Sequence, residues 1–403
     1  MVSKSKIYKK CSPNGKIFLY LDKREYVTCN GVTDPIKGAV FISDIVNTLQ
    51  GRRIYVQLKT TFRYGREEDE SMGITFKKEI ILDRVQMFCE GNKTDDNLTR
   101  MQNVLSTKFG DAVAPFTLNF PKLAPNSIII CDDEDEDPTK RTMGVFYEVR
   151  VHVAEYQDDY KGRKGSSTSM GIRKTQFTET KQLICPKDTC SKLFICSAGS
   201  ISLEASLEKE IFTHGEEIPV HVSIQNDSIR TIKEVKVFVY QFIDMKMLNM
   251  KYSNKVYSGT FEGEGCPILP GYSFHAVHQA KPLSQSTIIV RGVCLDAALS
   301  KEVDETNLAS SSISCTGDKN DILGIVVDYV IKVKVVCGGL GGAIMVDIPI
   351  KLVHPKPDTD MMMALLRAKE IISAKRKKFA GQDSVIQESN EIDGSLDIED
   401  NNQ

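Results

Sequence analysis

The sequence predicts an all-β protein of two antiparallel β-sandwich domains of the immunoglobulin-like type, with one short helix on the first domain and a mostly disordered C-terminal tail. Three observations support this. Apolar and polar residues alternate in many short runs on both sides of a polar middle segment, turn residues separate the runs, and few stretches have a helical period. The length of 403 residues fits two or three domains.

The first clear strand runs from Ile54 to Phe62. Ile54, Val56, Leu58 and Phe62 share one face, and polar residues occupy the other. This period of two predicts a half-buried strand, and the segment 76–82 is predicted to return beside it. Further alternating runs predict strands at 147–153, 201–205, 218–224 and 327–335.

A long charged loop connects the first two of these strands, with glycine at both ends. Such a hairpin tip buries little for the fold, so it is a candidate surface for a partner, with an ordinary solvated loop as the alternative. The residues of the hairpin tip are Tyr64, Gly65, Arg66, Glu67, Glu68, Asp69, Glu70, Ser71, Met72 and Gly73.

One helix is predicted in the first half of the chain. Asp96 is placed to cap it, and Gly110 is placed to end it. Its apolar stripe follows helical spacing and is expected to pack on the first sandwich. The stripe consists of Leu98, Met101, Leu105 and Phe109.

A second helix is predicted from Met361 to Ala380, beyond the sandwiches. Its apolar face ends beside the basic run 375–378. Three roles stay open: a linker, an inhibitory strap that docks through Phe379, or a basic amphipathic helix for an anionic membrane. Beyond Gln382 the chain is acidic and polar and is expected to be disordered.

The polar segment from Thr178 to Cys185 is the expected domain boundary. We predict a first sandwich over 1–178, a hinge over 179–185, a second sandwich over 186–357 and a tail over 358–403.

Composition narrows the classes of function. The net charge of −2 gives no overall attraction to nucleic acid or anionic membrane. No signal peptide and no apolar run of about 20 residues is seen, so the eleven cysteines are expected to be reduced and cytosolic. Catalytic and nucleotide-binding motifs are absent, and no cofactor or metal site is expected.

Several blocks of the sequence occur together in one order and carry a family resemblance. The chain resembles the arrestin family from about Ile7 to Pro357, and its hairpin tip is most similar to that of invertebrate photoreceptor arrestins. The blocks are Tyr8–Lys16, Tyr20–Val27, Asp296, Asp304–Ser311 and His354–Pro357.

The resemblance implies three groups of functional residues besides the hairpin tip. Receptor phosphates are expected to contact the basic residues Lys9, Lys10, Arg24, Lys108 and Lys301. A buried charge network, the polar core, is expected to hold the resting state through Glu25, Arg173, Asp296 and one of the two acidic residues Asp304 and Glu305. The chain's own tail is expected to dock on Ile7, Tyr8, Met101, Leu105 and Phe109.

The function that the resemblance implies is binding of activated, phosphorylated G protein-coupled receptors, foremost rhodopsin, which blocks G protein coupling. A cytoplasmic protein recruited to the plasma or photoreceptor membrane is expected, with anionic lipid or inositol phosphate as further ligands. The alternatives are a non-visual arrestin in receptor internalisation and a trafficking adaptor without phosphate sensing. Two family features are missing from the tail: an acidic, Phe-containing segment followed by Arg, and a clathrin box. Tail locking and binding of endocytic adaptors therefore stay open.

Overall fold

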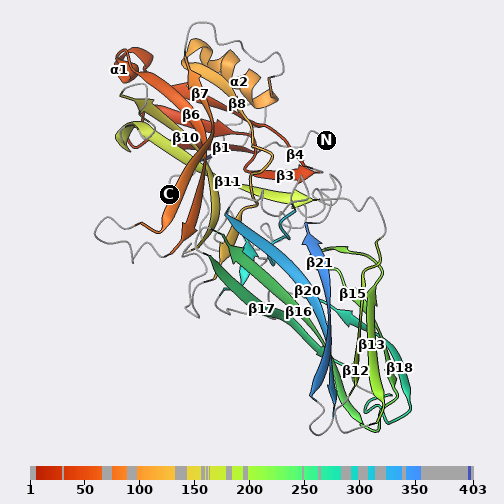
Figure 1. Cartoon of the computed structure of the whole chain (residues 1–403). Helices are drawn as coiled ribbons and strands as arrows, with labels where there is room; N and C mark the ends of the chain where they lie inside the picture. Colours follow the sequence, from red (N-terminus) through yellow and green to blue (C-terminus); the bar gives the residue numbers. More distant parts are fainter. Residues whose placement is uncertain are drawn as a thin grey trace, which may run out of the picture.

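The computed structural model describes residues 6–29, 31–65, 75–88, 98–131, 143–155, 159, 162, 164–177, 184–193, 198–246, 249–261, 265–282, 292–297, 307–313, 324–337, 342–354 and 398–400. Figure 1 shows an elongated molecule of two β-rich lobes, joined end to end. In the described ranges no helix is long and apolar enough to span a membrane.

The first lobe consists of two sheets. The five-stranded sheet has the order β22-β1-β2-β5-β8, made by Ile398–Asp400, Ile7–Cys11, Ile17–Leu21, Ile36–Ile42 and Val113–Leu118. The eight-stranded sheet contains the path β19-β9-β10-β11-β3-β4, made by Cys294–Asp296, Ile128–Ile130, Met143–Ala154, Ser167–Phe177, Glu25–Cys29 and Val32–Thr33. Its remaining strands are β6 (Arg53–Tyr64), which pairs with β10, and β7 (Lys77–Met87), which pairs with β6.

The second lobe is also a pair of sheets. The four-stranded sheet has the order β12-β13-β15-β18, made by Lys187–Leu193, Ser200–Leu207, Ile218–Asn226 and Ser273–Ala280. The five-stranded sheet has the order β14-β21-β20-β16-β17, made by Ile211–Thr213, Ala343–Val353, Ile325–Cys337, Ile232–Met245 and Met250–Thr260. This architecture confirms the predicted fold class.

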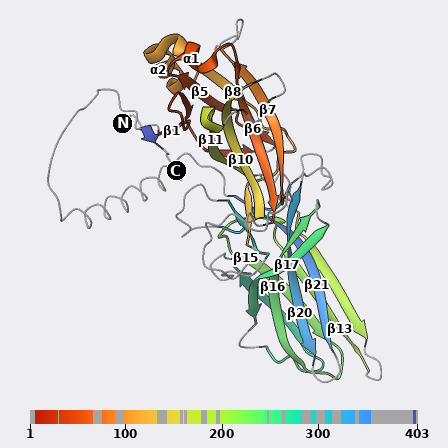
Figure 2. The same cartoon turned by 90° about the vertical axis from the view of Figure 1, so that its left-hand side faces the viewer.

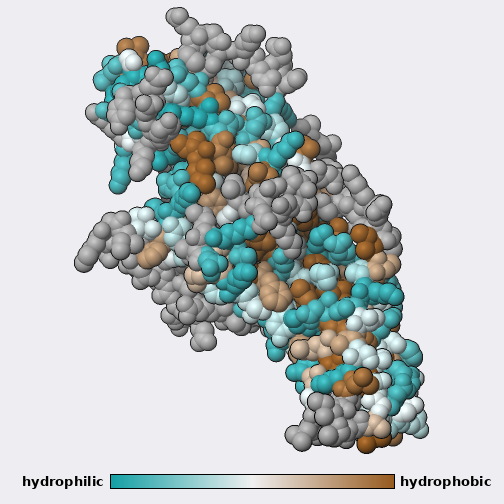
Figure 3. All heavy atoms as spheres, in the orientation of Figure 1, coloured by the Kyte–Doolittle hydropathy of each residue, from teal (hydrophilic) through white to brown (hydrophobic). Residues whose placement is uncertain are grey.

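Alternation explains which side chains form the core. In β20 every second residue from Val327 to Val335 is buried, and the same holds from Val145 to Val153 in β10. Because successive strand residues point to opposite faces, one apolar face per strand suffices to fill the space between two sheets. The outward faces are mixed, and Figure 3 shows hydrophilic and hydrophobic side chains interspersed over both lobes.

Two polar faces are more buried than the sequence predicted. Strand β6 is not half-buried: Gln57 and Lys59 on its polar face are only 1% and 8% exposed. The charge of Lys59 is stabilised despite this burial, because its Nζ lies 3.2 Å from a carboxylate oxygen of Glu79 and 2.6 Å from one of Glu148, on the two neighbouring strands. His152, on the predicted polar face of β10, is fully buried and stacks on Tyr55.

The predicted helix is present with a different start. Helix α2 runs from Arg100 to Phe109 and ends at Gly110 as expected. Its N-cap is Thr99 and not Asp96, because Thr99 and Gln102 form a reciprocal capping box. Leu98 therefore precedes the helix. The short helix α1 (Ile45–Leu49), the 3-10 turns at Gly110–Ala112 and Lys164–Ser166, and several short strands were not predicted from the sequence.

Part of the tail that was expected to be disordered is a strand. β22 pairs in parallel with β1, with Ile398 opposite Ile7 and Asp400 opposite Lys9. Figure 2 shows it beside β1, at the side of the first lobe. The open edge of β1 supplies unpaired backbone groups, which accounts for the added strand. The predicted helix at 361–380 lies outside the described residues.

Candidate functional site

Arg173 lies where the two lobes meet. It is part of β11, which runs parallel to β3 and places Arg173 opposite Glu25. Its Nη1 lies 3.5 Å from Oε1 of Glu25, and its Nη2 lies 3.7 Å from Oδ2 of Asp296. The guanidinium thus bridges one carboxylate from the start of the chain and one from residue 296, as the resemblance implied. Asp304 and Glu305 lie outside the described residues.

Asp296 is the buried centre of this arrangement, with 2% of its side chain exposed. Burial alone raises the pKa of its carboxyl. The hydrogen bond from His354 and the nearby charges outweigh burial and hold the pKa below its ordinary value. The backbone N–H of Ser310 also donates to Oδ1, at 3.3 Å. Asp296 is therefore ionised and partnered on both oxygens.

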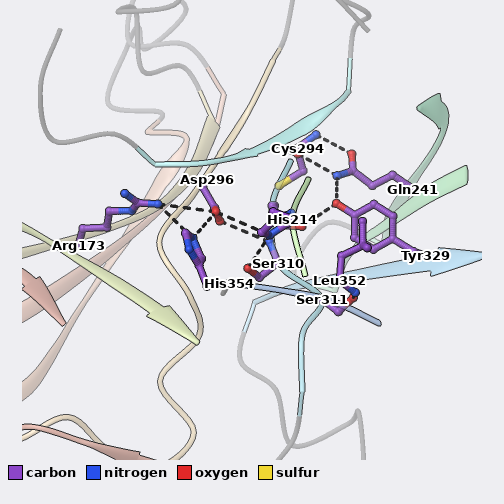
Figure 4. A network of polar contacts seen from close by, with 11 residues as sticks. Arg173, His214, Gln241, Cys294, Asp296, Ser310, Ser311, Tyr329, Leu352 and His354 are labelled. Carbon is purple, nitrogen blue, oxygen red and sulfur yellow. Dashed lines mark hydrogen bonds and ion pairs between the residues drawn. The ribbon is translucent and has the colours of Figure 1, made fainter. Parts of the chain in front are cut away.

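Two histidines complete the centre (Figure 4). Nε2 of His354, at the end of β21, donates to Oδ2 of Asp296 at 2.6 Å. Because a carboxylate only accepts, this contact places the proton on Nε2. His214 follows β14, and its Nε2 lies 4.0 Å from the same Oδ2 and 3.0 Å from Oγ of Ser310. The two rings lie 5.4 Å apart in an edge-on arrangement.

His214 is neutral at neutral pH. Burial is the largest influence and lowers its pKa; Asp296 opposes this, and His354 and Arg173 add to it, so that the pKa is about 4. The centre therefore holds one buried anion, one guanidinium and a buried, uncharged imidazole. Such a network is stable only while its partners are in place.

Strand β19, which carries Asp296, is fixed by both lobes. It pairs with β9 of the first lobe, with Asp296 opposite Ile128. Gln241 of β16 exchanges two hydrogen bonds of 2.8 and 2.7 Å with the backbone of Cys294, and its Nε2 also lies 2.7 Å from the hydroxyl of Tyr329. The carboxylate of Asp296 is thus held at the junction, and Figure 4 shows this continuous network.

The basic residues predicted to contact phosphate divide between the two faces of one sheet. Strand alternation puts Lys9 and Lys10 on opposite faces of β1. On the α2 side, Lys9 lies over the ring of Phe18 and Lys108 over that of Phe109. The ring of Phe41 joins them, 5.5 Å from Phe18 and 4.7 Å from Phe109.

Arg24 belongs to the opposite face. It lies over the ring of Tyr8, and its Nε donates to the carbonyl oxygen of Gly171 at 2.8 Å. By alternation Tyr8 shares this face with Lys10. The structure therefore brings Arg24 toward Lys10 and groups Lys9 with Lys108. Lys301 lies outside the described residues.

The residues predicted to dock the tail lie around β1. Ile7, Met101 and Leu105 are buried in one apolar cluster, and Phe109 packs against it. Tyr8 packs instead against the main core, because alternation turns it to the other face. The tail segment observed beside β1 is 398–400, whereas Phe379, the residue predicted to dock, lies outside the described residues.

The base of the hairpin tip is described, and its remainder (66–73) lies outside the described residues. The backbone N–H of Tyr64 donates to the carbonyl oxygen of Phe76 at 2.9 Å, which closes the two strands. A Cβ at Gly65 would come within 2.6 Å of the Phe76 ring, so glycine is needed there.

Two family models match most of the chain. "Arrestin (or S-antigen), N-terminal domain" matches residues 17–176, and "Arrestin (or S-antigen), C-terminal domain" matches residues 197–357. The chain belongs to the arrestin family. Arrestins regulate signalling by binding activated G protein-coupled receptors and ending their coupling to G proteins, and this arrestin has that function.

Curated relatives agree with this assignment. An "Arrestin homolog" of Locusta migratoria is 38% identical over 93% of this chain and 90% of the relative. "Arrestin, lateral eye" of Limulus polyphemus is 38% identical over 87% and 85% of the two chains. "Phosrestin-1" of Calliphora vicina is 37% identical over 89% and 87%.

The sequence of this arrestin did not predict His214 and His354 as partners of Asp296. His354 was noted only as the first residue of the block His354–Pro357, and no pattern singled out His214. Their shared position depends on β14 and β21 pairing in parallel, with Thr213 opposite Val353, so that both histidines leave the sheet at the same edge. Sequence spacing carries no signal of that pairing.

Proposed function

We propose that this arrestin terminates signalling by phosphorylated rhodopsin in invertebrate photoreceptor cells. The arrestin of the lateral eye of Limulus polyphemus is among its relatives, which supports the visual subtype. The protein works in the cytosol and is recruited to the photoreceptor membrane by its receptor. The hairpin tip at 64–73 enters the cytoplasmic cavity of the active receptor, where it excludes the G protein.

The bridge of Arg173 to Glu25 and Asp296 is the observation that carries the proposal. Asp296 is buried and depends on its partners, because an unpaired buried charge is strongly destabilising. A phosphate brings a charge of about −1.5 to −2 and three acceptor oxygens. It competes with the two carboxylates for the guanidinium of Arg173, which opens the junction between the lobes.

Two groups of basic residues, on opposite faces of the sheet that contains β1, deliver the phosphates to this centre. Arg24 directly precedes Glu25, whose partner across the strands is Arg173, and it lies over the ring of Tyr8, which shares a face of β1 with Lys10. Lys9 and Lys108 form the second basic group, on the α2 side. Receptor phosphates bind first to these lysines and then reach Arg173. Inositol phosphates and anionic lipid headgroups offer the same chemistry and are further ligands of these residues.

The tail supports the resting state through its backbone. β22 occupies the edge of β1 from Ile7 to Lys9. A receptor tail that adds as a strand to the same edge must displace β22, since an edge pairs with only one strand. The tail therefore raises the amount of phosphorylated receptor needed for binding.

The proposal is tested by co-sedimentation with rhodopsin membranes from an invertebrate retina in four states: dark or illuminated, phosphorylated or not. Strong binding is expected only for illuminated, phosphorylated rhodopsin. Equal binding in all four states would refute phosphate sensing. Binding to a panel of other phosphorylated receptors with the same strength would instead identify a broadly acting arrestin.

A further inference from the structure

Three side chains of the polar centre form the donor set of a metal site. Nε2 of His354 and Nε2 of His214 lie 2.6 and 4.0 Å from the same Oδ2 of Asp296, and the three donor atoms all lie within 4.8 Å of one another. Two imidazoles and a carboxylate are the ligands of many zinc sites. We propose that His214, Asp296 and His354 bind a divalent transition-metal ion of the zinc class when Arg173 leaves Asp296.

The two contacts to Asp296 need only small adjustments. Zinc holds nitrogen and oxygen ligands at about 2.0–2.2 Å, so tetrahedral donors lie roughly 3.4 Å apart. The contact from Asp296 to His354 must lengthen and that to His214 must shorten, each by less than about 1 Å on this basis. Ligation through Nε2 moves the proton of His354 to Nδ1, so the ring stays neutral.

Arg173 and the metal exclude each other. Nη2 of Arg173 lies 3.7 Å from Oδ2 of Asp296 and 3.2 Å from Nε2 of His354, which are two of the three donor atoms. A divalent cation held by these atoms stands within a few ångströms of the guanidinium, where like charges repel strongly. The resting bridge therefore keeps the metal out.

The net charge of the centre becomes more negative once Arg173 is withdrawn. Glu25, Arg173 and Asp296 together carry −1, and the two carboxylates alone carry −2. A divalent cation restores neutrality beside the buried Asp296. The metal thus replaces the guanidinium as the partner of Asp296.

Metal binding would prolong the activated state. A ligand that binds one of two states stabilises that state, and the coupling is reciprocal. The metal therefore favours release of Arg173, and phosphate at Arg173 favours metal binding. This regulation rests on the proposed switch, whereas the site itself depends only on removal of the guanidinium.

The site is tested by titrating the full-length protein with Co²⁺, a spectroscopic substitute for zinc, and then displacing it with Zn²⁺. In Arg173→Gln we expect visible d–d bands of a nitrogen- and oxygen-ligated ion, and an affinity at least about 10-fold above that of the wild type. Adding His354→Gln or His214→Gln should each weaken binding by at least about 100-fold, because loss of a ligand costs more than the roughly 10- to 100-fold that follows loss of a supporting contact. His221→Gln, which alters an exposed histidine of the second lobe, is the matched control and should change nothing.

Three results would overturn the site: no Co²⁺ bands in folded Arg173→Gln, bands that persist without both histidines, or a thiolate charge-transfer band, which assigns the ion to cysteine. Circular dichroism verifies that each variant is folded, and Asp296→Asn added to Arg173→Gln should also remove binding. A phosphorylated peptide added to the wild type then tests the switch separately. If Arg173→Gln binds Co²⁺ and the peptide does not raise wild-type affinity, the switch fails and the site stands.

Discussion

His354 donates a hydrogen bond of 2.6 Å to Asp296, so the residue that follows β21 of the second lobe partners the carboxylate that Arg173 contacts from the first. Asp296 is 2% exposed, and three elements from distant parts of the sequence meet at it. The resting state of this arrestin is therefore held by a carboxylate with partners on both lobes. A change at any of these partners should alter how readily the junction opens.

Arg173→Glu tests the switch directly. The new carboxylate repels Glu25 and Asp296, so binding to illuminated, unphosphorylated rhodopsin should approach binding to the phosphorylated form. Loss of one partner of a buried pair costs about 3–5 kcal/mol, and a lower unfolding temperature is expected. Arg52→Glu, which breaks a peripheral pair with Glu155, is the control. A preserved preference for phosphorylated receptor would show that Arg173 is not the trigger.

Lys9→Ala and Lys10→Ala should be made separately, because the two side chains point to opposite faces of β1. Each should weaken binding to phosphorylated receptor by about 1.5- to 5-fold, the range of single exposed charge contacts, and reduce its salt dependence. Lys187→Ala on the second lobe is the matched control. If the two variants lose affinity unequally, the larger loss identifies the face of β1 that contacts phosphate. If a variant loses as much affinity in the Arg173→Glu background as in the wild type, its lysine has a structural role.

Deletion of Glu68 to Ser71 shortens the hairpin tip. The fold should persist, since the strands are closed by the contact of Tyr64 with Phe76 below the deletion. Binding to illuminated, phosphorylated rhodopsin should fall sharply, while binding to an isolated phosphorylated tail peptide should remain. Unchanged affinity for the receptor, measured in the same membranes, would eliminate the tip as the probe of the cavity.

Truncation after residue 397 removes β22 and frees the edge of β1. Binding to unphosphorylated receptor should rise, because no strand has to be displaced from Ile7 to Lys9. Removal of 401–403 alone keeps β22 and serves as the control. If both truncations behave like the full chain, β22 does not restrain the resting state.

Stability should fall as the solution becomes acidic, with His152 as one cause. Burial is the main reason that the pKa of this histidine is lowered from 6.5 to about 4 in the folded state. Between these values the unfolded chain binds a proton that the folded chain does not, so stability is lost as pH falls from 6.5 to 4.

Urea unfolding of the wild type and of His152→Gln at several pH values measures this effect. The variant is expected to be less stable at pH 7.5 and to depend less on pH. Its remaining slope is expected from His214, whose pKa is also about 4. Identical slopes for the two proteins would exclude His152 as the cause.

The sequence by itself determined several of the strands, the fold class and the family. The alternation of apolar and polar residues over 327–335 and 147–153 directly predicts burial of one face of each strand, since the side chain of a strand residue lies on only one side of the sheet. The same local reasoning found the end of α2 at Gly110, and the motif residues Glu25, Arg173 and Asp296 were found by resemblance. The positions of the domain boundaries, the phosphate contacts and the hairpin tip stay predictions.

Only the tertiary structure decided what surrounds each charge. Gln57, Lys59 and His152 look outward in an alternating pattern, and they are buried because neighbouring strands and their side chains cover that face. His214 and His354 meet at Asp296 because two strands 140 residues apart run in parallel and end at the same edge. Pairing between distant strands depends on the packing of the whole sheet, and no local pattern encodes it. The sequence therefore identified the charged residues Glu25, Arg173 and Asp296 of the polar centre, but not the two histidines that complete it.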